Sequence, residues 1–179
     1  MAKLNLTRRD IIRGVSITVG LTNAGACDDI VRTAPEVAAD PVLVEYFLNF
    51  SEQATGFSLD DLESTDQATV YFATVRDALG VDRLGEFLHA YHNDGLDAVL
   101  GSPRAGPIAR NVIKLWYTAM WERLPREWQS AYGRTLNDTT FIVSAAAYKT
   151  GLLWRAIGVN PPGANAPGYG TWSNPPART

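Results

Sequence analysis

Hydrophobic residues recur along this chain every three to four positions, the spacing of one buried helix face. The first such segment opens at Pro41 and stops at Gly56, with apolar positions at Leu43, Phe47, Phe50 and Ala54. Later segments with the same spacing cover residues 68–79, residues 81 to about 93 with a short turn over 96–100, and residues 107–120. Ser64 and Gln67 form a capping-box pattern before the second segment, and Pro107 suits the first turn of the last. The pattern predicts four amphipathic helices up to Pro125.

A fifth helix is predicted from Asp138 to about Thr150, although the β-branched pair Thr139-Thr140 weakens its start. Beyond it, residues 160–179 contain five of the ten prolines of the chain. Neither a helix nor a central strand persists through so many prolines. We therefore expect an extended strap at the C-terminal end.

The composition agrees with a packed helical domain. Of the 179 residues, 46% are hydrophobic and 20% are charged, a balance typical of globular proteins. The predicted fold is all-α: a small irregular bundle of about five helices with an extended Pro/Gly-rich C-terminal strap. The predicted domains are a leader over 1–26, a helical domain over 27–159 and a tail over 160–179.

Charge divides the chain unevenly. Residues 1–26 carry a formal charge of +3 and the remainder carries −6. An acidic body cannot neutralise a run of phosphates, from which most nucleic-acid affinity comes. Nucleic acid is therefore not an expected partner.

The leader has the layout of a twin-arginine export signal. Arg8 and Arg9 precede an apolar pair, and a short, uncharged, weakly hydrophobic stretch runs from Gly14 to Ala26. Its thirteen residues would span about 20 Å as a helix, too short for a membrane span of about 30 Å. We expect export to the periplasm by the twin-arginine route, with an ordinary secretory signal or a basic arm as the alternative.

A cut after Ala26 would leave Cys27 as the first mature residue. Small residues at positions 24 and 26 fit signal-peptidase cleavage, whereas a cysteine at the cut fits lipidation. Both readings stay open.

Candidate catalytic chemistry is sparse. With Cys27 as the only cysteine, the chain alone has no disulfide, no cysteine-ligated zinc and no iron–sulfur cluster. Glu86 and His89 share one helix face, with His92 nearly on it, and these three residues are the basis of an alternative reading as an autonomous periplasmic metal-binding protein or enzyme. Di-iron sites need a second Glu-x-x-His, which the sequence lacks, so no metal site is expected.

Aromatic residues gather in two places. Trp116 and Trp121 lie near one face of the strongest helix, which suits either the core or a subunit interface. Tyr169 and Trp172 lie in the proline-rich tail, where large apolar groups need a surface to cover them.

Three segments resemble the small, gamma-type subunit of bacterial membrane-associated FAD-dependent sugar and polyol dehydrogenases, the sorbitol, fructose, glucose and gluconate group. Besides the leader, they are residues 47–56 (FLNFSEQATG), 115–121 (LWYTAMW) and 170–175 (GTWSNP). The resemblance extends over most of residues 44–176.

The resemblance implies a division of labour. A large GMC-type flavoprotein partner would bind FAD and oxidise the sugar or alcohol, and a further subunit with haem c would pass electrons to quinone. This chain would be no enzyme and would hold no cofactor; it would escort the flavoprotein through folding and export, and the complex would associate with the inner membrane. The residues expected to contact the partner are Trp116, Trp121, Trp154, Tyr169, Trp172 and Pro175.

Overall fold

The structure, a computed structural model, describes residues 40–162. Chain contacts separate a unit Met1–Val37 from a unit Ala38–Thr179, and every described residue belongs to the second. The predicted signal and residues 163–179 of the predicted strap thus lie outside the described residues. Within residues 40–162 the fold is all-α, which confirms the predicted class.

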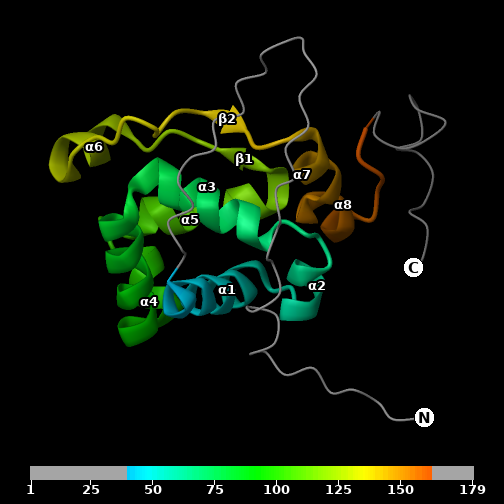
Figure 1. Ribbon diagram of the computed structural model, residues 1–179, viewed down its shortest axis with the longest axis horizontal. Coiled ribbons are helices and arrows are strands. Elements are labelled where there is room, and N and C mark those ends of the chain that lie inside the picture. Colours follow the sequence, from blue (N-terminus) through cyan, green and yellow to red (C-terminus); the bar gives the residue numbers. More distant parts are fainter. Residues whose placement is uncertain (1–39, 163–179) are drawn as a thin grey trace, which may run out of the picture. The chain divides into compact units, whose positions relative to one another are not determined.

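Eight helices and one short strand pair make up the described part (Figure 1). The helices are α1 (Pro41–Thr55), α2 (Leu59–Glu63), α3 (Ala68–Leu79), α4 (Val81–Gly101), α5 (Gly106–Thr118), α6 (Arg126–Tyr132), α7 (Ala145–Thr150) and α8 (Leu152–Ile157). The strands β1 (Met120–Trp121) and β2 (Phe141–Ile142) pair antiparallel, with Met120 opposite Ile142. In Figure 1, α1 and the strand pair lie on opposite sides of α3 and α5.

Local signals explain the start and the break of the long helices. At the start of α1 the Asp40 carboxylate accepts from the Val42 amide at 3.0 Å, and Pro41 occupies the first turn. The predicted break after Asn93 falls inside α4, where Gly95 has φ 82° and ψ 176°. A side chain would strain this backbone, so glycine lets the helix kink there.

The predicted capping box at Ser64 and Gln67 is wrong. Gln67 precedes α3 without a capping side-chain bond, and Ser64 instead ends α2, where its hydroxyl donates to the Asp61 carbonyl at 2.7 Å. The serine cap in this region belongs to Ser58 at the start of α2, a helix that the sequence pattern missed. Ser58 accepts from the Asp61 amide there, and its hydroxyl donates to the Asp61 carboxylate.

The predicted helix over 138–150 is also corrected, because only its end is helical. Phe141–Ile142 pairs with Met120–Trp121, and α7 begins at Ala145 behind the Ser144 cap. β-branched residues favour extended backbone, which explains why the weak helix start became a strand. α5 likewise ends at Thr118, before the predicted stop at Pro125, so that the chain can enter β1.

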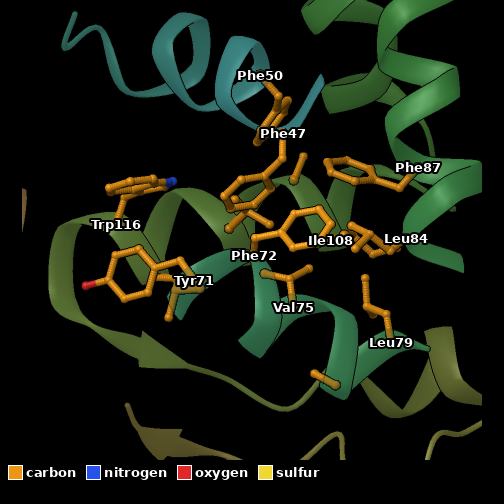
Figure 2. Packing of buried hydrophobic residues seen from close by; sticks show 14 of the residues in the cluster. Phe47, Phe50, Tyr71, Phe72, Val75, Leu79, Leu84, Phe87, Ile108 and Trp116 are labelled. Atoms are coloured by element: carbon orange, nitrogen blue, oxygen red, sulfur yellow. The ribbon is translucent and has the colours of Figure 1, made fainter. Parts of the chain in front are cut away.

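The core lies between α1, α3, α4 and α5 (Figure 2). Phe47 of α1 packs edge-on against Phe72 of α3, with ring centroids 5.6 Å apart. Phe50 makes the same kind of contact with Phe87 of α4 at 5.1 Å. Fully burying such a side chain contributes about 1.5–3 kcal/mol. The packing of Phe47 and Phe50 therefore holds α1 against α3 and α4.

Two hydrogen bonds join α1 to α5 across this core. The Trp116 indole N–H donates to the Ser51 hydroxyl at 2.8 Å, and that hydroxyl donates to the Phe47 carbonyl at 2.7 Å. One turn later, the Tyr117 hydroxyl donates to the Thr55 carbonyl at 2.9 Å. These contacts connect the segments 47–56 and 115–121, which are more than sixty residues apart along the chain.

Tyr71 of α3 has a buried hydroxyl with no hydrogen-bond partner among the described residues. Its ring packs edge-on against Trp116 at 4.9 Å, and its hydroxyl points away from the other labelled side chains in Figure 2. Burial raises the pKa of Tyr71 far above its ordinary value. The residue therefore acts as a neutral core side chain.

Replacing Ser51 with alanine should lower the free energy of unfolding by about 1–3 kcal/mol, because the buried Trp116 N–H would lose its acceptor. Urea unfolding followed by circular dichroism measures this loss. Ser130→Ala on the exposed face of α6 is the matched control and should change stability by less than about 0.5 kcal/mol. Equal stability of the two variants would contradict a role for this hydrogen bond.

Candidate partner-binding surface

Two of the tryptophans expected to contact a partner are core residues. Trp116 is 1% exposed and Trp121 is 0% exposed. Both indole N–H groups are satisfied inside the chain, Trp116 by Ser51 and Trp121 by the Asp138 carboxylate at 3.0 Å. Their assignment to a partner surface is corrected, since the fold itself covers both rings.

Trp154 occupies an intermediate position. The ring is half-buried, its N–H donates to the Tyr148 carbonyl at 2.7 Å, and it packs edge-on against the Tyr148 ring at 5.2 Å. Its partner-facing role stays a prediction. Tyr169, Trp172 and Pro175 lie outside the described residues, as do Arg8, Arg9, Ala26 and Cys27 of the leader.

The Glu-x-x-His face of α4 separates into two unrelated sets of contacts. Glu86 pairs with Arg104, whereas His92 stacks on the Tyr46 ring at 4.1 Å and His89 meets the edge of that ring at 5.7 Å. In residues 40–162 no group of three or more His, Cys, Asp or Glu side chains is placed to hold a metal ion.

A membrane-spanning helix has to be both long and apolar. Within residues 40–162 no helix meets both requirements.

Two buried polar side chains hold the segment of residues 119–144: Asn111 ties it to α5, and Asp138 ties separate parts of the segment to one another. Asn111 bonds both backbone groups of Glu122, accepting from its N–H at 3.0 Å and donating to its carbonyl. The Asp138 carboxylate, 1% exposed, accepts from Trp121, from the Leu124 amide at 3.1 Å and from Gln129 at 3.3 Å. Since a buried carboxylate needs several donors, these bonds determine the path of the segment.

This path leaves an open groove beside α3, which we name the α3–β2 groove. It encloses about 570 Å³ and is lined by Thr69, Val70, Ala73, Thr74, Asp77, Ala78, Asn137 and Phe141. Val70 is 41% exposed and Phe141 is 37% exposed, and next to Asn137 the Leu136 side chain is 93% exposed. Apolar side chains exposed along one groove mark a surface suited to another protein.

The residues that line the groove favour binding of another protein. Asp77 is the one ionisable side chain among the residues that line it, and it interacts with Arg76 at 3.5 Å. The Thr135 hydroxyl donates to the carbonyl of Ala78, one of the lining residues. This surface was not predicted from the sequence, because Val70 and Phe141 look like ordinary members of apolar runs. One signal could have indicated it: Val70 falls outside the buried stripe of its helix, which is formed by Tyr71, Phe72, Val75 and Leu79.

In comparison with known proteins, no family model, no curated protein and no solved structure matches this chain.

Replacing Asp138 with alanine should lower the free energy of unfolding by about 2–3 kcal/mol, because several buried donors lose a charged acceptor. Amide hydrogen exchange should rise over residues 120–142, since this segment is held through the carboxylate. Asp97→Ala on the exposed face of α4 is the control and should leave both quantities unchanged. Unaltered exchange in the Asp138→Ala variant would show that other contacts hold the segment.

Proposed function

We propose that this chain is the non-catalytic small subunit of a periplasmic FAD-dependent sugar or alcohol dehydrogenase. In this proposal the partner is a large GMC-type flavoprotein that carries FAD, and a further subunit carries haem c. The small subunit covers part of the flavoprotein, stabilises it and takes it through the twin-arginine route. The complex is associated with the inner membrane.

The observation that carries the proposal is the sequence resemblance of residues 47–56 and 115–121 to the small-subunit family. The contacts of these segments support it at the level of the fold, because Trp116 bonds Ser51 and Tyr117 bonds the Thr55 carbonyl. Two short motifs distant in the sequence thus form one structural unit.

The α3–β2 groove supports a role in binding. Its exposed apolar side chains, Val70 and Phe141, give a protein partner a surface to cover. We assign this surface to the flavoprotein in place of Trp116 and Trp121. The tail residues Tyr169, Trp172 and Pro175 remain part of the proposed contact.

The escort role is tested by replacing Arg8 and Arg9 with lysine. Twin-arginine export depends on the arginine pair, so the substrate-dependent dye-reducing activity of the flavoprotein should move from the periplasmic to the cytoplasmic fraction. Arg13→Lys in the same leader is the control and should leave the activity in the periplasm. Periplasmic activity in the double variant would contradict the escort role.

The partner surface is tested by placing a charge in the groove. Val70→Glu should weaken co-purification of the flavoprotein about tenfold or more, because a carboxylate would be buried against apolar surface. Val42→Glu is the matched control, since Val42 is 46% exposed and also lies in the first turn of a helix. That helix, α1, lies on the side of α3 and α5 opposite the strand pair (Figure 1). Equal recovery of the flavoprotein with both proteins would exclude the groove as the contact surface.

A further inference from the structure

A second cavity lies between α4, the α4–α5 connection and α6, and it differs in chemistry from the groove. It encloses about 170 Å³ and is lined by Arg83, Glu86, Phe87, Ala90, Ser102, Arg104, Ala105, Ile108 and Trp128. Arginine borders it twice, at Arg83 and Arg104, and the rest of the wall is mainly apolar. We infer that this cavity binds a small organic carboxylate, with Arg83 as the group that receives the anion.

The charge of Arg83 is incompletely satisfied in the described part of the chain. Its Nη2 donates to the Tyr132 carbonyl at 2.9 Å, whereas its Nη1 is buried and has no hydrogen-bond partner there. No carboxylate of residues 40–162 forms an ion pair with it. A buried guanidinium N–H without an acceptor is costly, and an anion that supplies the acceptor removes that cost.

Aromatic rings hold the two guanidinium groups in place. Arg83 lies over the Trp128 ring and Arg104 lies over the Tyr132 ring, each with its Cζ atom 5.7 Å from the ring centroid. The two rings are themselves in contact, with centroids 5.5 Å apart, and the Trp128 N–H donates to the Arg104 carbonyl at 2.8 Å. The cations are thereby positioned before any ligand arrives, which reduces the entropy lost on binding.

Gly133, at the end of α6, leaves the space that the Arg83 guanidinium occupies. Its φ is +86°, and a Cβ atom built there would lie 2.8 Å from Arg83 Nη2. A side chain at position 133 would therefore collide with the guanidinium, so glycine is needed for this position of Arg83.

The charges at the cavity favour an anion of single charge. Arg104 pairs with Glu86 on the rim, so this pair is neutral and Arg83 supplies the excess positive charge. The planar fork of a guanidinium matches the two oxygens of a carboxylate. Phe87, Ile108 and Trp128 provide apolar contact for the remainder of the ligand.

Size limits the ligand further. A cavity of about 150 Å³ accepts one benzene ring, so this one suits a short aliphatic or single-ring monocarboxylate. Benzoate and benzamide form a suitable probe pair because they have the same shape and differ in charge.

The test is calorimetric titration of the full chain with sodium benzoate and with benzamide at constant ionic strength. We expect one benzoate to bind per chain with a dissociation constant below about 10 mM, and benzamide to bind about tenfold more weakly or not at all. Equal affinity for the two probes, or no binding heat for benzoate up to about 50 mM, would overturn the inference.

Two variants locate the binding. Arg83→Met keeps the aliphatic stem against Trp128 and should weaken benzoate binding about tenfold or more, whereas Arg126→Gln makes the same charge change on α6 outside the cavity and should alter it less than about twofold. Equal losses in both variants would mean that benzoate responds only to net charge, which overturns the site.

If circular dichroism shows that Arg83→Met is unfolded, Arg104→Gln replaces it. The Arg104 side chain is 53% exposed, so its loss should leave the fold intact, and the exposed Glu86 carboxylate then borders the cavity without its partner. Weaker benzoate binding in this variant supports the site, and unchanged binding overturns it.

Discussion

The fold depends on the connection between α1 and α5 in the middle of the helical core. Ser51 is buried and accepts from Trp116, and Tyr117 reaches the backbone of Thr55 one turn away. Packing alone allows helices to slide past one another, whereas a buried indole N–H has to find one acceptor. The register of α1 against α5 follows from that requirement, and α3 and α4 pack against the pair.

Trp116 and Trp121 also show why aromatic content is a poor guide to an interface. Each ring serves two purposes in the domain, since it fills the core and its N–H bonds a buried oxygen from a distant part of the chain. The apolar surface left for a partner consists of smaller or isolated side chains, such as Val70 and Leu136, that no neighbouring element covers. In the proposed complex, the tryptophans build the domain and the groove beside α3 contacts the flavoprotein.

Sequence periodicity predicted the helices correctly where burial of one helix face stabilises them. The extents of α1 and α3 and the break of α4 at Gly95 follow from apolar spacing and from glycine or proline at the ends. It failed over residues 119–144, where Asn111 and Asp138 hold the backbone through side-chain bonds to residues 11 to 17 positions away. No local pattern encodes such bonds, so a helix was predicted where β2 forms.

The same reasoning explains what was missed of the candidate sites. The Glu86 and His89 spacing was visible in the sequence, but their real contacts, Arg104 and Tyr46, come from other elements. The groove requires α3 and β2 to lie together, and the Arg83 cavity requires α4 and α6 to do so. Both are products of tertiary packing, which periodicity does not report.

The most direct test of the account is amide hydrogen exchange on the exported chain, measured alone and in complex with the flavoprotein that co-purifies with it. The account predicts protection on binding over residues 69–78 and 136–142, the two sides of the α3–β2 groove, with little change over α1. Protection confined to α1 or to α8, or a chain that is recovered without any flavoprotein, would contradict it.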